Sequence, residues 1–171
     1  MLPPLHTWPG PYRKLIAAFV AVMVTGFVLG TIFIEVTTHM TPEGVVAQYK
    51  GHTKKQAKTA EAMKFPKSAK EMLNITHTHI LGLSMMFLIL GFLYLHTGRR
   101  STLRLAIAVE PLFTLILTFG GLWVVRYVWE PFVYVVIVSG VLMVGTVAWM
   151  GYRICGSCLA GDTYQSAQKV A

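Results

Sequence analysis

Residues 15–34 read LIAAFVAVMVTGFVLGTIFI and lie between Lys14 and Glu35, with no charged side chain among them. An α-helix needs about 20 apolar residues to cross a hydrocarbon core of about 30 Å. The run is continuously apolar, whereas a strand of a membrane barrel alternates in character over about 10 residues. The stretch therefore predicts a transmembrane helix, and it is too long for the apolar part of a cleaved signal peptide.

Three further windows have the same character. They cover residues 72–98, 105–125 and 132–152, and Glu110 is the one acid within them. The chain is 54% hydrophobic and 13% charged, with a mean hydropathy of +0.58, which excludes an ordinary water-soluble domain. We therefore predict an all-α fold, an integral membrane four-helix bundle in which residues 1–171 form a single membrane domain. The expected parts are helical spans at about 15–36, 73–96, 104–126 and 131–153, an outer loop at 37–70 and a cytoplasmic tail at 154–171.

The loop between the first two spans carries two helix-start signals. Thr41 precedes Pro42 and Glu43, which places a hydroxyl at the N-cap, proline at the first helical position and an acid near the positive end of the helix dipole. A short surface helix that ends near Gly51 is expected. The order Ser68-Ala-Lys-Glu71 has the form of a capping box and predicts that the second long helix begins at Ser68, outside the membrane.

The orientation follows from the basic residues closest to the helix ends, because these determine topology. Arg13, Arg99, Arg104 and Arg153 all lie near helix ends on the side that carries both termini. We therefore expect both termini in the cytoplasm and the loop at 37–70 outside. The lysines of this loop are expected to bind an acidic partner, such as an external redox protein, or anionic lipid headgroups. These lysines are Lys50, Lys54, Lys55, Lys58, Lys64, Lys67 and Lys70. No nucleic-acid partner is expected.

Histidines at membrane depth are candidates for a cofactor site, because polar residues there usually face the bundle interior or a partner. His77 and His79 lie near the outer interface, about 200° apart around their helix. His77 shares a seam with small residues, so we predict that it faces inward, with His39 as its partner from the end of the first span. Such a pair could ligate the iron of a b-type haem or another transition metal. The alternative is that these histidines bind only backbone, headgroups or water.

Arg126 and Glu110 are the other candidates. Arg126, in the outer turn before the last span, could pair with a haem propionate or a quinone-site acid, or it could simply pair with Glu130 at a helix end. Glu110 could serve a proton path, or it could reach back to Arg104 near the inner interface.

Cys155-Gly-Ser-Cys158 is the sole cysteine pair and follows the last span. C-x-x-C alone is half of a zinc or iron–sulfur ligand set, and no histidine follows it as covalent haem attachment requires. We interpret it as an ordinary pair of thiols. The chain carries no phosphate loop, nucleophile elbow or HExxH motif, so hydrolase and nucleotide-driven functions have no support.

Several short motifs follow one another in a recognisable order. They are Thr41-Pro-Glu-Gly44, Phe65-Pro-Lys-Ser68, Ile75-Thr-His-Thr-His79 and Arg126-Tyr127. In this order the chain resembles a group of small, uncharacterised bacterial inner-membrane proteins. The resemblance covers most of the chain. It implies a multi-pass, four-helix protein of the bacterial inner membrane and no particular activity, cofactor or site.

Two functions fit these observations best. The first is a subunit of a respiratory or electron-transfer complex that holds a haem b or borders a quinol near the outer face, through His77, His39, His79 and Arg126. The second is a non-catalytic accessory subunit that docks through its basic loop and small-residue helix faces, such as Gly26-x-x-x-Gly30. Either would be a subunit rather than a stand-alone enzyme. A proton-coupled transporter built on Glu110 is less favoured, because no internal repeat or discontinuous helix is visible.

Overall fold

The computed structural model describes residues 3–52, 63–99 and 101–170, with side chains as far as residue 161 in the last segment. These residues form helices and turns, and no strand occurs among them. Four helical segments are long and apolar enough to cross a membrane, which confirms the predicted all-α membrane bundle. The elements are η1 (Leu5–Thr7), α1 (Gly10–Thr38), α2 (Pro42–Lys50), α3 (Ala69–Leu95), α4 (Thr102–Tyr127), η3 (Glu130–Phe132) and α5 (Val133–Val170).

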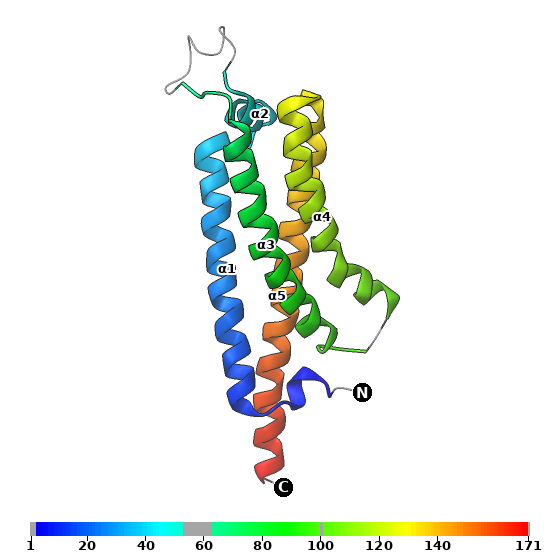
Figure 1. The fold of residues 1–171 in the computed structure, drawn as a ribbon. Helices are drawn as coiled ribbons and strands as arrows, with labels where there is room; N and C mark the ends of the chain where they lie inside the picture. The colour runs from blue at the N-terminus through cyan, green and yellow to red at the C-terminus, as the bar shows by residue number, and fades with distance from the viewer. Residues whose placement is uncertain (1–2, 53–62, 100, 171) are drawn as a thin grey trace.

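The four long helices run up and down alongside one another, and α5 packs against α1, α3 and α4 (Figure 1). The short helix α2 lies at one end of the bundle, which we call the α2 end. The N-terminal segment and the end of α5 lie at the opposite end, which we call the terminal end. η1 packs on α5 there, so the chain crosses over the terminal end before α1 begins.

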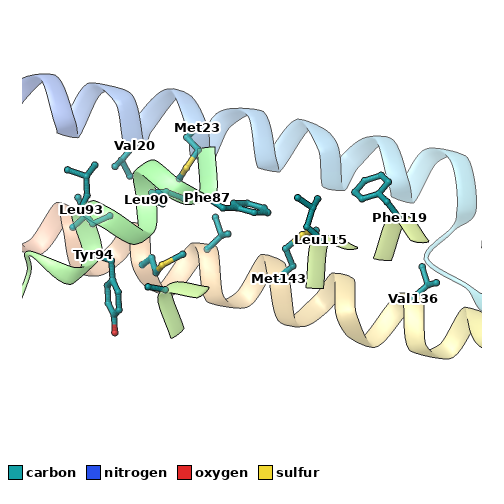
Figure 2. Packing of buried hydrophobic residues seen from close by; sticks show 14 of the residues in the cluster. Val20, Met23, Phe87, Leu90, Leu93, Tyr94, Leu115, Phe119, Val136 and Met143 are labelled. Carbon is teal, nitrogen blue, oxygen red and sulfur yellow. The ribbon is translucent and has the colours of Figure 1, made fainter. Parts of the chain in front are cut away.

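The core is a column of apolar side chains between the helices. Phe87 and Leu90 of α3 are completely buried, and Leu115 of α4 and Met143 of α5 continue the column toward the α2 end (Figure 2). Val20, 1% exposed, joins it from the first half of α1. Because lipid is as apolar as this core, close packing rather than water exclusion holds such helices together.

The two predicted helix starts at the α2 end are confirmed. Thr41 is the N-cap of α2, and its hydroxyl accepts a hydrogen bond from the Gly44 N–H over 3.0 Å. Ser68 is the N-cap of α3 and forms a complete capping box with Glu71. Such caps satisfy backbone N–H groups that have no partner inside the helix. The first residues of α2 and α3 are thus determined by local sequence.

α4 bends because it contains Pro111. Proline has no N–H for the carbonyl four residues earlier, and its ring crowds that carbonyl, so a helix kinks at this point. The first part of α4 turns away from α5 in Figure 1. The bend lies directly after Glu110, the one acid of the predicted third span.

α1 is the least enclosed of the four long helices. In its most apolar window 11% of residues are buried, against 28% to 39% in the other three. Its buried residues all lie before Val24, apart from Thr38 at its end. The half of α1 nearer the α2 end (residues 24–37) therefore packs only loosely against this chain.

Candidate functional site

The two histidines of α3 are both exposed. The His77 side chain is exposed, so its predicted inward orientation is wrong. The His79 ring stacks on Phe119 of α4, with 4.7 Å between ring centroids. His79 is itself exposed at the edge of this helix pair, and its Nδ1 lies 2.7 Å from the Ile75 carbonyl oxygen.

The rotation of α3 is set by its contacts with α4, which the sequence does not reveal. Trp123 Nε1 of α4 donates a hydrogen bond to the Thr76 hydroxyl of α3 over 2.9 Å. This contact turns the side of α3 that carries Thr76 toward α4. On the seam of His79, Leu93 is buried and Met86 packs partly against the core. On the seam of His77, Gly91 is buried next to Ala108 of α4, but His77 itself is exposed.

His39 does not meet His77 in an enclosed pocket. It is the C-cap of α1, with a left-handed φ of 51°, and its side chain is exposed. The described residues contain no group of three or more potential metal ligands. Since both side chains lie at the surface, these residues do not form a closed haem site within this chain. Haem ligation by His39 and His77 stays a prediction.

A polar network joins α2 to the turns at the α2 end. Arg126 Nε donates to the Lys67 carbonyl over 3.0 Å, and the Lys67 N–H donates to the Tyr49 carbonyl over 3.0 Å. Lys50 forms an ion pair with Glu130. The predicted Arg126–Glu130 pair is therefore wrong, because both residues pair instead with the loop that folds back over them. The network fixes α2 against α4 and η3.

Only some of the loop lysines are in the described part of the chain. Lys64 Nζ donates to the Thr37 carbonyl, and Lys50 and Lys67 belong to the network just described, so these three have roles within the chain. Lys70 is exposed on α3. Lys54, Lys55 and Lys58 lie outside the described residues. Binding of an acidic partner through the loop stays a prediction.

A shallow groove runs between α4 and α5 on the surface of the bundle. Its lining is mainly apolar, and two of its polar residues are bonded within the protein. The Ser139 hydroxyl lies 2.8 Å from the Thr118 hydroxyl, and the Thr114 hydroxyl donates to the Glu110 carbonyl over 3.1 Å. Such a lining suits an acyl chain or a quinone tail. The predicted quinone site stays a prediction. The lining residues are Thr114, Leu117, Tyr134, Val135, Val138, Ser139 and Leu142.

Glu110 does not reach back to Arg104, contrary to one of the two expectations for it. The Arg104 guanidinium donates to the Tyr94 carbonyl and to the Thr97 hydroxyl at the end of α3. Both carboxyl oxygens of Glu110 are buried, and neither has a hydrogen-bond partner within the described segments. Among the described residues, Arg104 Nε is the other buried side-chain nitrogen or oxygen without a hydrogen-bond partner.

The terminal end holds a site that the sequence analysis missed. Arg13 of α1 is 2% exposed. Its Nη1 donates to the Cys158 carbonyl over 2.7 Å and its Nε to the Trp8 carbonyl over 3.0 Å. The Leu5 N–H donates to the His96 carbonyl over 2.8 Å. These contacts attach the N-terminal segment to α3 and α5, and the role expected of Arg13 was only that of a charge that sets orientation.

The cysteines of the C-x-x-C sequence are both free thiols in α5. Cys158 is buried and Cys155 is half-buried. The interpretation of the pair as ordinary thiols stays a prediction.

The comparisons with known proteins identify the family but no activity. No curated protein and no solved structure matches the chain. A family model does match, over residues 39–163, and it describes a transmembrane helical domain, Aq_1264_TM. The match takes in α2, α3, α4 and most of α5, and it begins where α1 ends. Because it spans more than half of the sequence, the chain belongs to the Aq_1264_TM family of transmembrane helical domains.

Proposed function

We propose that the chain is a non-catalytic subunit of a larger membrane complex and binds a helix of a neighbouring subunit through residues 24–37 of α1. The observation that carries the proposal is that no side chain from Val24 to Thr37 is buried. Only Phe27, Thr31 and Thr37 are half-buried. A membrane helix with this little packing inside its own chain has most of its surface available to another helix.

The open surface has the form that membrane helices use to approach closely. Gly26 and Gly30 lie one turn apart, and a Cβ atom built on either would have no neighbour within 4 Å. A small-x-x-x-small pair lets two helix backbones come together and gain dispersion contacts. Val22 and Phe33 flank this face and are 74% and 65% exposed. The family match also begins after α1, so the proposed contact lies outside the shared domain.

A photocrosslinking residue in place of Phe33 shows whether a protein helix or lipid lies next to this face of α1. We expect it to give an adduct of defined mass with a different membrane protein, because the Gly26–Gly30 face would hold that protein's helix nearby. The matched control is the same residue at Phe113 of α4, which is 73% exposed and should react with lipid only. Irradiation of intact membranes followed by mass spectrometry identifies the products.

Glycine variants make the test specific for the face. Gly26→Leu with Gly30→Leu should abolish the Phe33 adduct, since the larger side chains keep the helices apart. Gly82→Leu on α3, where a Cβ also meets nothing within 4 Å, should leave it unchanged. Lipid adducts alone at Phe33, or an adduct with a second copy of this chain, would contradict the proposal.

A redox function is the second candidate, and one observation favours it. The Ile75 carbonyl can only accept a hydrogen bond, so Nδ1 of His79 is the donor, over 2.7 Å, and Nε2 of the neutral ring carries the lone pair. That is the arrangement in which a histidine ligates a metal. A haem here would nevertheless need a partner chain to cover it, because His39, His77 and His79 are all exposed.

An optical spectrum separates the two candidates. We expect the chain, purified alone in mild detergent, to be colourless both air-oxidised and dithionite-reduced, because it offers no enclosed haem site among its described residues. A Soret band with sharp reduced α and β bands would instead support the redox function. In that case His39→Ala, His77→Ala and His79→Ala variants would show which ring binds the iron.

A further inference from the structure

Glu110 is half-buried in the bundle, and its carboxyl group has no ion-pair partner among the described residues. It is the ninth residue of α4, which begins at Thr102, so it lies about 12 Å along the helix at 1.5 Å per residue. Both of its carboxyl oxygens are buried and have no hydrogen-bond partner in the described part of the chain. An ionised carboxylate in such a place loses its hydration without compensation.

No positively charged side chain is bonded to this carboxyl among the residues that the structure describes. Arg104 is six residues away on the same helix, about 9 Å along the axis and on another side of it, and its guanidinium binds the end of α3. On α3, Tyr94 is buried, and the Nδ1 of His96 lies 2.7 Å from the Phe92 carbonyl oxygen of its own helix. The part of α4 that holds Glu110 turns away from α5 (Figure 1), and residues 139–151 of α5 contain no titratable residue.

The bend of α4 offers a protonated carboxyl a partner. Pro111 has no N–H, so the Ile107 carbonyl lacks the donor that residue 111 supplies in an unbroken helix. A carboxylate cannot donate to that carbonyl, but a carboxylic acid has an O–H that can. Ile107 lies one turn before Glu110, on a neighbouring part of the helix surface. Protonation would therefore remove the buried charge and also provide a hydrogen-bond donor.

We propose that the Glu110 carboxyl holds a proton in the folded protein at neutral pH and is a proton-binding site within the membrane bundle. The site would react with an apolar carbodiimide that enters from the lipid. The acid O–H adds across one C=N bond of dicyclohexylcarbodiimide, with its proton going to nitrogen and its oxygen bonding to the central carbon. The O-acylisourea then rearranges to an N-acylurea, so nothing leaves and the adduct carries the full mass of the reagent.

The experiment treats membranes that contain the full chain with dicyclohexylcarbodiimide at neutral pH and maps the adduct by mass spectrometry. We expect the adduct on Glu110 and its complete loss in Glu110→Gln, a neutral variant of the same shape. Glu43, exposed on α2, is the internal control and should stay unmodified because it is ionised in water. A water-soluble carbodiimide with an added amine should modify Glu43 and leave Glu110 unmodified.

A second measurement does not depend on whether the reagent can enter. The infrared spectrum should contain the C=O stretching band of a protonated carboxyl in the wild type, and Glu110→Gln should lack it. The absence of both the adduct and this band in the folded wild type would overturn the proposal. Labelling of Glu110 by the water-soluble reagent as readily as Glu43 would also overturn it, since the carboxyl would then be in water.

Discussion

Replacing Arg13 with alanine should detach the N-terminal segment from α5 and lower the free energy of unfolding by about 3 kcal/mol. This value is the lower end of the loss expected for two hydrogen bonds of a charged donor, each worth about 1.5–3 kcal/mol. Arg13 is 2% exposed and donates to the carbonyls of Trp8 and Cys158.

The solubilised protein is unfolded by heat or by a denaturing detergent, and circular dichroism monitors the loss of helix. The measured quantity is the midpoint of this unfolding transition. Lys14→Ala is the matched control, because Lys14 is the adjacent basic residue of α1 and is exposed. Gly161→Ala should reproduce part of the loss, since its Cβ would lie 2.1 Å from Arg13 Nη1, whereas Gly156→Ala meets nothing within 4 Å. Equal midpoints for Arg13→Ala and Lys14→Ala would show that the two bonds contribute nothing to stability.

The helices of this protein could be predicted because their signals are local. Uncharged runs of membrane length determine the four long helices, and a hydroxyl before Pro42 or a Ser68–Glu71 pair determines where a helix starts. Each of these features acts within one helical turn or one span. No knowledge of a neighbouring helix is required to read them.

The rotation of each helix could not be predicted, because it depends on contacts between segments far apart in the sequence. His77 was expected inward on the basis of its own helix, yet the Trp123–Thr76 hydrogen bond and the His79–Phe119 stack set the orientation of α3. Hydrophobic periodicity gives little help in a membrane, where the outward face is apolar as well.

The ion pairs and polar contacts were missed for the same reason. Arg126 and Glu130 are close in sequence, but they do not bond to each other. Arg126 donates to the carbonyl of Lys67, which lies before α3. Glu130 pairs with Lys50, the last residue of α2. Arg13 is the converse case. Its position beside an apolar run indicated a charge at the membrane surface, whereas the structure buries it against a carbonyl 145 positions away. The two chain ends must come together before that role exists.

Replacing Gly44 with alanine should displace α2 and lower the free energy of unfolding by about 3 kcal/mol, near the top of the usual range for overpacking. A Cβ at Gly44 would lie 1.9 Å from the Thr38 carbonyl oxygen and 2.7 Å from its carbon. Both are backbone atoms at the end of α1, so they cannot turn aside as a flexible side chain would. The turn at Thr41, which accepts from the Gly44 N–H, must open instead.

Tyr49 reports this displacement directly. Burial raises the pKa of its phenol above the ordinary value, because the charged form is poorly solvated there. When α2 moves away in Gly44→Ala, Tyr49 becomes hydrated and its pKa should fall toward the ordinary value. The ultraviolet absorption of tyrosinate, titrated with and without Tyr49→Phe, isolates its signal from the other tyrosines.

Gly26→Ala is the matched control for this variant, since its Cβ has no neighbour within 4 Å. Alanine favours a helix more than glycine does, so the unfolding midpoint should not fall, and the Tyr49 titration should not change. The Lys67 N–H bonds to the Tyr49 carbonyl, and Lys50 pairs with Glu130, so a moved α2 loses both contacts together. An unchanged Tyr49 titration in Gly44→Ala would mean that the α1–α2 turn absorbs the added methyl group locally. The Lys50, Tyr49 and Lys67 contacts, rather than the close approach at Gly44, would then hold α2 in place.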